Sequence, residues 1–295
     1  MASYLFKSKS EPVRQNPPSP EEQQRKRFSN SVALIGTKTN LQINEVREQL
    51  GDLTTEMPGF LTDGTIRRFL RSKNWSTVQA TKALKETVKW RRQYKPETIR
   101  WEDLAERENE VKRVYIADYR DKNGRTVYIS KLSIKSLTST KEHIKQAVYN
   151  LENLAMDSEG AQEDNVVWLM DCRGWRPSDT PIGESRETLH ILQNYYPGLI
   201  AIAVNSDPPK IFESFWKILK HFVEPTMKER VKFVYSDSPD SQRIVTDLFD
   251  LDKLDSAFGG RNTAGLDVVK YGERMRARDQ IRGACTHGNA NPSSS

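Results

Sequence analysis

Short apolar segments alternate with longer segments of helical periodicity between residues 111 and 235, and this alternation limits the possible folds most. The run Val166–Met170 contains only apolar residues, which is typical of a strand covered on both faces. Leu199–Val204 and Val231–Tyr235 are two further strand candidates. In the segments between them, spacings of three and four place apolar residues on one side of a helix. The pattern predicts an α/β fold with a mostly parallel sheet.

The first two strand candidates, Val111–Tyr119 and Thr126–Ser130, are expected to pair differently from the others. They are joined by Asp121-Lys122-Asn123-Gly124, and an Asn-Gly pair readily adopts the positive φ angles of a tight turn. The sequence therefore predicts an antiparallel hairpin at the start of the sheet.

The chain before the hairpin has a different character. Prolines among charged and polar residues predict a disordered arm over residues 1–38. Helical spacing predicts a small helical lobe over 39–98, in which Asp63 and Ser76 are candidate N-caps. An α/β lobe then covers 99–262, and residues 263–295 form a C-terminal helix and tail.

The formal net charge of +6 lies at the two ends of the chain. Residues 1–39 hold seven basic and three acidic side chains, and residues 264–295 hold five and three, so the part between them is neutral. Phosphate binding requires basic side chains gathered on a folded face, so we expect no nucleic-acid partner. No apolar run approaches the roughly 18 residues that span a bilayer, and the N-terminus lacks the apolar region of a signal peptide. These features predict a cytoplasmic protein.

Motifs for catalysis and metal binding are missing. The sequence has no glycine-rich nucleotide loop and no GxSxG elbow. Cys172 and Cys285 lack metal-ligand spacing, and the four histidines are isolated: His143, His190, His221 and His287. Asp171 follows a predicted parallel strand, where catalytic residues often lie, but a carboxylate there also caps the Asp-Cys-Arg-Gly turn, and we favour that role. We predict no enzyme, no metal and no cofactor.

Residues 209–223 form the most informative predicted helix. At about 100° per residue, its apolar side chains share an arc of roughly 160°; they are Ile211, Phe212, Phe215, Trp216, Ile218, Leu219, Phe222 and Val223. Lysines occupy the opposite side, Pro209 suits the first turn and Pro225 ends the helix. One interpretation is a helix packed on the sheet. The other is a lid that faces an apolar ligand and also lies on a membrane.

Several segments of the chain together form a recognisable pattern. They are DGTIRRFLRSKNW (63–75), NGRTVY (123–128), VVWLMDCRG (166–174), LQNYYP (192–197), PPKIFESFWKILKHFV (208–223) and FGG (258–260). In content, order and spacing they resemble the CRAL-TRIO family of phosphatidylinositol and phosphatidylcholine transfer proteins. The resemblance implies a helical lobe and an α/β lobe whose sheet floors an apolar lipid cavity. It also implies that the helix over 209–223 is the gate of that cavity.

The resemblance further implies where a lipid head group is bound. The candidates are Arg125, Tyr128, Arg176, Ser178, Tyr195, Tyr196, Arg230 and Lys232. Members that bind phosphatidylinositol carry a Glu after Tyr-Pro, where this chain has Gly198, and a Lys at the position of Arg230. Arg125 and Tyr128 could instead close the hairpin, the two tyrosines at 195 and 196 could belong to the core, and the basic pair at 230 and 232 could be solvated.

The function implied by the resemblance is a non-enzymatic monomer, peripheral on membranes, that holds one phospholipid and exchanges it there. Two alternatives stay open. One is a regulator that responds to bound lipid and controls a lipid kinase or a trafficking partner. The other is a carrier of a compact hydrophobic molecule such as a tocopherol or a sterol.

Overall fold

The computed structural model describes residues 36–104, 112–134 and 138–287. The predicted disordered arm before residue 36, Val111 of the predicted hairpin and residues 288–295 of the predicted tail lie outside these ranges. A helix covers 36–50, so the last three residues of the predicted arm are helical. The chain from Ile43 onward forms one compact unit, and the description below is of that unit.

The helical part of this unit contains α2 (Leu53–Glu56), α3 (Asp63–Ser72) and α4 (Thr77–Tyr94). Their apolar faces meet in a core of their own, which includes the fully buried Phe69 and Leu84. Ser76 caps α4 as predicted, because its hydroxyl accepts from Gln79 N. Asp63 does not cap α3. The cap is Thr62, whose backbone is extended and whose hydroxyl accepts from Thr65 N at 3.1 Å.

Five strands form one sheet in the order β1-β2-β3-β4-β5. They are β1 (Val114–Arg120), β2 (Thr126–Lys131), β3 (Val166–Asp171), β4 (Ile200–Ser206) and β5 (Val231–Val234). β1 pairs antiparallel with β2, and every other pair is parallel. The predicted α/β class, the hairpin and the mostly parallel sheet are therefore confirmed.

Two short 3₁₀ helices precede the sheet, and the other helices connect its strands or follow it. They are η1 (Pro96–Thr98), η2 (Trp101–Asp103), α6 (Thr140–Asp157), η3 (Pro177–Asp179), α7 (Ile182–Tyr195), α8 (Lys210–Leu219), η4 (Lys220–Phe222), α9 (Pro225–Glu229), α10 (Pro239–Leu248), η5 (Ser256–Phe258) and α11 (Val268–His287). The predicted helix over 209–223 is thus α8 followed by one tighter turn, η4. Such 3₁₀ turns are common at the end of an α-helix.

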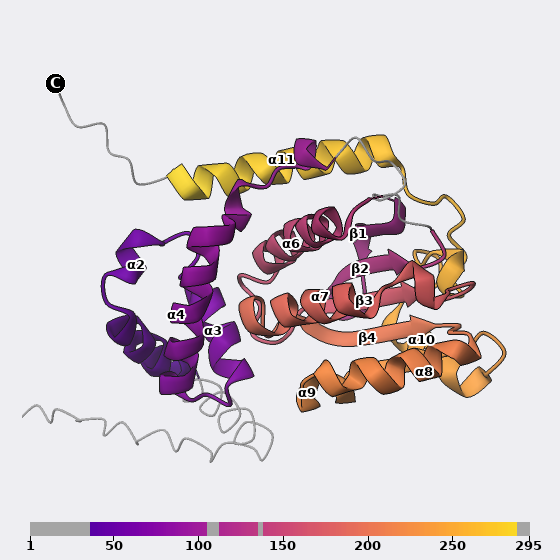
Figure 1. Cartoon of the computed structure of the whole chain (residues 1–295), viewed down its shortest axis with the longest axis horizontal. Helices are drawn as coiled ribbons and strands as arrows, with labels where there is room; N and C mark the ends of the chain where they lie inside the picture. The colour runs from indigo at the N-terminus through magenta and orange to yellow at the C-terminus, as the bar shows by residue number, and fades with distance from the viewer. Residues whose placement is uncertain (1–35, 105–111, 135–137, 288–295) are drawn as a thin grey trace, which may run out of the picture. The chain divides into compact units, whose positions relative to one another are not determined.

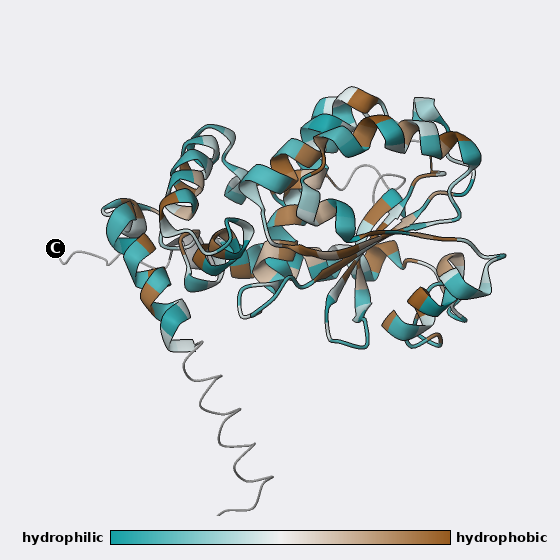
Figure 2. Ribbon diagram, turned by 90° about the horizontal axis from the view of Figure 1, so that it is seen from below, coloured by the Kyte–Doolittle hydropathy of each residue, from teal (hydrophilic) through white to brown (hydrophobic). Residues whose placement is uncertain are grey.

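The two faces of the sheet carry different helices, and helices lie on both sides of it in Figure 2. Strand residues alternate between faces, and the register brings Tyr128, Trp168 and Ala203 to one of them. This face lies under α6, α7 and α8. On the other face, Tyr119 meets Phe249 just after α10, with ring centroids 6.4 Å apart.

The free edge of β1 is covered by α11, which runs along the top of Figure 1. The Tyr271 hydroxyl accepts from Ile116 N at 3.3 Å, and Arg274 donates to Ala117 O at 3.0 Å. An uncovered edge strand exposes unpaired backbone groups that invite pairing with another chain. α11 supplies side-chain partners to these groups instead.

Candidate functional site

An apolar cavity of about 190 Å³ lies between the sheet and helices α6, α7 and α8. Its floor consists of Tyr128 and Ser130 from β2, Trp168 and Met170 from β3, and Ala203 and Asn205 from β4. These six residues lie side by side in the strand register. The structure therefore places an apolar hollow over the sheet, where the resemblance implies one.

α8 closes this cavity with only part of its apolar surface. Four of its side chains line the hollow, Phe212, Phe215, Trp216 and Leu219, and Val223, just after η4, lines it too. The other three point outward, since Ile211 is 53% exposed, Ile218 56% and Phe222, in the following turn, 39%. We call these three the outer trio. The single apolar arc predicted from the sequence is thus divided between the cavity and the surface.

Polar groups also line the cavity. His143 of α6 and Glu184 of α7 are hydrogen-bonded, with 2.8 Å between Nδ1 and Oε1. Arg113, which lies just before β1, also lines the cavity and is 7% exposed. Burial raises the pKa of Tyr128 on the floor. The side chains that α8 contributes to the cavity are therefore apolar, and the polar groups of its lining come from other elements.

Aromatic contacts hold the first half of α8. Phe212 is the buried residue of this helix, and its ring centroid lies 4.9 Å from that of Trp175. Trp216 meets Phe233 of β5 at 5.8 Å. The chain enters α8 through Asp207, which has a φ of 46° and is followed by two prolines. A left-handed residue before a rigid Pro-Pro segment sets a defined boundary between β4 and the helix.

The far end of α8 is tied to α7 through one amide side chain. Gln193 Nε2 donates to Phe222 O at 2.9 Å, and Gln193 Oε1 accepts from Glu224 N at 2.7 Å. Arg186 of the same helix lies over the Phe222 ring, 4.3 Å from its centroid. Gln193 therefore holds both backbone groups at the junction of η4 and α9.

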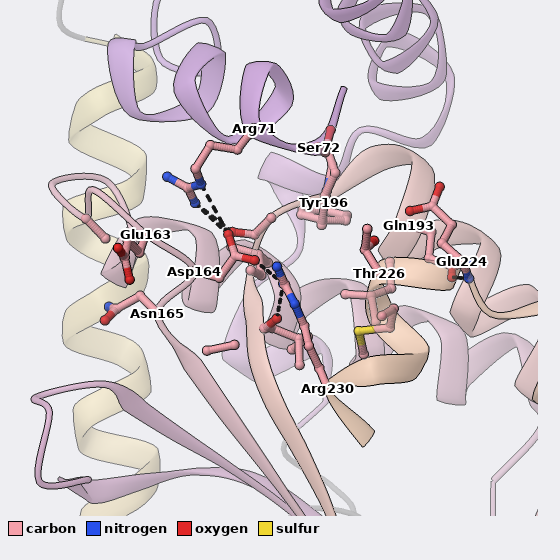
Figure 3. Close-up of a pocket in the computed structure, with 18 of the residues that line it drawn as sticks. Arg71, Ser72, Glu163, Asp164, Asn165, Gln193, Tyr196, Glu224, Thr226 and Arg230 are labelled. Carbon is pink, nitrogen blue, oxygen red and sulfur yellow. Dashed lines mark hydrogen bonds and ion pairs between the residues drawn. The ribbon is translucent and has the colours of Figure 1, made fainter. Parts of the chain in front are cut away.

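A second hollow is polar and larger, about 830 Å³. Figure 3 shows the Asp164 carboxylate at its centre, between Arg71 of α3 and Arg230 at the end of α9. Asp164 accepts from Arg71 at 2.8 Å and also pairs with Arg230. Gln193 lines this cleft as well, and Met227 lines both the cleft and the apolar cavity. The two hollows are therefore neighbours.

Backbone geometry explains why residue 198 is a glycine, although the resemblance implies a Glu at this position. Gly198 has a φ of 68°, and a Cβ there would lie 3.1 Å from the carbonyl oxygen of Arg68. A glutamate at this position would be strained on both counts. The carboxylate near Arg230 comes instead from Asp164, in the loop before β3.

The eight head-group candidates fall into three groups. Tyr128 lines the apolar cavity, and three others line the polar cleft: Arg125, Tyr196 and Arg230. Arg125 also donates to Asp121 at 2.7 Å and so closes the hairpin. The remaining four line neither hollow. Tyr195 stacks on Trp90 at 4.3 Å, Lys232 is exposed, and Arg176 with Ser178 lies on η3, where both are exposed.

The structural interpretation of Asp171 agrees with the geometry. Its carboxylate accepts from the backbone N of Arg173 at 3.2 Å and from the guanidinium of the same residue at 2.8 and 2.9 Å. It therefore caps its own turn.

In the described ranges, no three His, Cys, Asp or Glu side chains gather as they would around a metal ion. Within the same ranges no helix combines the length and apolar character needed to cross a bilayer.

The sequence matches the model of a known protein family. The CRAL/TRIO domain model matches residues 110–260, which is just over half of the chain. This chain belongs to the CRAL/TRIO domain family. The resemblance seen in the sequence is confirmed at that level.

Individual relatives of this CRAL/TRIO protein are distant. SEC14 cytosolic factor of Candida glabrata is 26% identical over 227 residues, which cover 70% of this chain and 74% of that protein. Phosphatidylinositol transfer protein PDR17 of Saccharomyces cerevisiae is 26% identical over 181 residues, with coverages of 56% and 50%. A CRAL-TRIO domain-containing protein of Schizosaccharomyces pombe is 26% identical over 202 residues, which cover 68% of this chain but only 19% of that protein.

A solved structure supports the fold. The crystal structure of Sfh5 superposes with a TM-score of 0.53 at 15% sequence identity, over 74% of this chain and 81% of that one. At this identity the likeness concerns the arrangement of helices and strands.

Sequence reasoning missed three residues that shape the polar cleft of this CRAL/TRIO domain. Arg71 and Gln193 lie inside the quoted motifs DGTIRRFLRSKNW and LQNYYP, so attention to their polar members could have found them. Asp164 had no such signal. It lies 93 residues from Arg71 and 66 from Arg230 in the chain.

Asp164 and its two partners, Arg71 and Arg230, form a charged triad whose contribution to stability can be predicted. Its side chain is 11% exposed and Arg71 is 15% exposed, so Asp164→Asn leaves two partly buried guanidiniums without their carboxylate. We expect the free energy of unfolding to fall by about 2–3 kcal/mol, less than for a fully buried pair. Urea denaturation measures this, with Asp252→Asn as the control, since the ion pair of Asp252 with Arg261 is exposed. Equal losses in the two variants would contradict the role of the triad.

Proposed function

We propose that this protein binds one phospholipid of the phosphatidylinositol or phosphatidylcholine class and transfers it between membranes without covalent chemistry. The observation that carries the proposal is the two-sided apolar surface of α8, with one part over an apolar cavity and the outer trio facing solvent. Relatives named as a phosphatidylinositol transfer protein and as SEC14 cytosolic factors support it.

The energetics explain why such a protein requires a closed cavity. The two acyl chains of a phospholipid contain about 30 methylenes at about 0.8 kcal/mol each, so free passage through water costs on the order of 20 kcal/mol. A dry apolar cavity removes most of that cost. The affinity must stay near that of a bilayer, because a ligand held much more tightly would not be delivered.

The proposed ligand requires that the cavity enlarge. A cavity of about 150 Å³ holds a molecule the size of benzene, so about 190 Å³ does not hold two acyl chains. In our proposal the structure is the closed state, and α8 swings away from the sheet as a gate. The hinge would lie at Asp207 and the two prolines on one side, and at the Gln193 contact on the other.

In this proposal the head group reaches the polar cleft. Met227 lies between the cavity and the cleft, so a lipid with its chains under α8 can extend its phosphate toward Arg230 and Arg71. Guanidinium groups match phosphate oxygens with two parallel hydrogen bonds. Asp164 would then orient the two arginines and reduce their net charge.

The small volume of the closed cavity favours one second candidate, a compact apolar ligand such as a tocopherol or a sterol. Such a ligand requires less displacement of α8 than a diacyl lipid does. Competition between a tocopherol or sterol and labelled phosphatidylcholine distinguishes the two. Displacement only by phospholipids supports the main proposal.

The primary test is to identify the bound molecule and to measure its transfer. Native mass spectrometry of the purified chain should find one co-bound amphiphile, and labelled phosphatidylcholine or phosphatidylinositol should move between vesicles faster with the protein than without it. Absence of any bound amphiphile, together with an unchanged transfer rate, would refute the proposal.

The Gln193 contact gives a prediction about the gate. Gln193→Ala removes both hydrogen bonds that hold the end of α8, each worth about 1 kcal/mol. We expect the open state to become more populated, by about tenfold or more, and both uptake and release of lipid to accelerate. Stopped-flow fluorescence of labelled lipid measures the rates, with Gln162→Ala as a control at an exposed position of the same cleft. Equal rates in wild type and Gln193→Ala would contradict the proposal that the Gln193 contact controls the movement of α8.

A further inference from the structure

A third cavity, of about 450 Å³, lies where α3 and α4 of the helical lobe meet α6 and α11. It is separate from the polar cleft, although Tyr196 lines both. Three deeply buried arginines line it: Arg68 is 3% exposed, Arg91 4% and Arg282 8%. Its volume falls within the range of small-molecule sites, about 300–1,000 Å³.

Two of these arginines have carboxylate partners. Arg91 donates to both oxygens of Glu152, at 2.7 and 3.0 Å, and the Tyr196 hydroxyl donates to Glu152 at 2.6 Å. Arg282 donates to Asp279 at 2.7 Å. The charges of Arg91 and Arg282 are therefore compensated within the protein.

Arg68 has no such partner in the described part of the chain. Its guanidinium contacts only neutral acceptors, the Thr65 hydroxyl at 3.0 Å and Ala155 O at 3.4 Å. Its Nε has no hydrogen-bond partner there. The other carboxylate on the cavity wall, Glu159, instead accepts from Thr62 and from the backbone N of Gly64.

Burial is unfavourable for a cation, and it lowers the pKa of Arg68 to about 10, although the nearby Glu159 carboxylate acts against this lowering. A guanidinium beside a cavity, with unused donors and a hydroxyl from Thr65 next to it, suits a tetrahedral oxyanion. The cavity wall carries these three arginines and two glutamates, Glu152 and Glu159, and neither glutamate is hydrogen-bonded to Arg68.

We propose that this cavity is a phosphate-binding site in which Arg68 is the principal ligand. The bound group supplies the anionic hydrogen-bond partner that Arg68 lacks, and it joins the helical lobe to α6. The phosphate belongs either to a small soluble phosphate or to a lipid phosphomonoester. This site is distinct from the Arg71 and Arg230 cleft and goes beyond the proposed lipid transfer.

Thermal unfolding of the full chain tests the site, with inorganic phosphate compared with chloride at equal ionic strength and neutral pH. We expect wild type to melt several degrees higher in phosphate, with a saturable dependence. Arg68→Met should melt higher than wild type in chloride, because it removes a buried charge that has no hydrogen-bonded carboxylate, and it should lose the phosphate-dependent rise. Arg230→Gln, which alters only the polar cleft, should keep that rise.

A second arm replaces free phosphate with phosphatidylcholine vesicles that contain phosphatidylinositol 4-phosphate. A rise that depends on Arg68 in this arm alone assigns the phosphate to a lipid, and a rise with inorganic phosphate assigns it to a soluble anion. No rise in either arm overturns the proposal. So does a rise that persists in Arg68→Met, or a lower melting temperature of that variant in chloride, since a purely structural Arg68 predicts that loss. Transfer of phosphatidylcholine should be unchanged in Arg68→Met, so this test is independent of the gate.

Discussion

Replacing the outer trio with serine, in the variant Ile211→Ser, Ile218→Ser and Phe222→Ser, should reduce vesicle-to-vesicle transfer of phosphatidylcholine at least tenfold and leave the fold intact. These side chains are 39–56% exposed, so shortening them costs the folded protein little packing beyond the contact of the Phe222 ring with Arg186. Each large apolar side chain that enters a membrane contributes about 1.5–3 kcal/mol. Losing three of them removes most of the apolar contact through which α8 would meet a bilayer.

A matched control is available on other helices. Val78, Val269 and Ile281 are 70%, 71% and 56% exposed, so Val78→Ser, Val269→Ser and Ile281→Ser remove a similar apolar surface from α4 and α11. We expect this control variant to transfer lipid at the wild-type rate, with both variants folded by circular dichroism. Equal loss of transfer in the two would mean that no specific membrane contact lies on α8.

The second large effect is expected from filling the cavity. Ala147 of α6 lines the apolar hollow, and Ala147→Phe introduces a ring of the size that a cavity of about 150 Å³ accommodates. We expect the melting temperature to stay equal or to rise, since a void is filled. Bound phospholipid, measured by lipid extraction and mass spectrometry, should fall at least tenfold.

Ala264→Phe is the control for this substitution, because it places the same ring at an exposed position after the sheet. It should keep the wild-type amount of bound lipid. A wild-type lipid content in Ala147→Phe would show that the ligand occupies some other part of the molecule.

Much of the fold follows from local patterns. The apolar run Val166–Met170 and the Asn-Gly turn were sufficient to predict a central strand and the hairpin, because strand burial and turn geometry depend on neighbouring residues. The cap of α3 was misplaced by one residue. Thr62 and Asp63 are both good N-cap types, and the choice depends on which backbone is extended, which the sequence does not display.

The site was less predictable, for two physical reasons. Periodicity located the apolar arc of α8 but not which part of it faces the sheet, since that depends on how the helix is rotated when it packs. The carboxylate of the cleft, Asp164, meets Arg71 and Arg230 only through the fold, at separations of 93 and 66 residues. Gly198 could be explained only once its φ of 68° was known.

The central claim is that the space beneath α8 opens to hold acyl chains, and photo-crosslinking tests it most directly. Phosphatidylcholine with a diazirine on one acyl chain is loaded into the full chain, irradiated and mapped by peptide mass spectrometry. We predict labels on Trp168 and Met170 of β3 and on Leu219 of α8, which line the cavity. Labels confined to the exposed Ile211 and Ile218, with none on the sheet, would contradict the account.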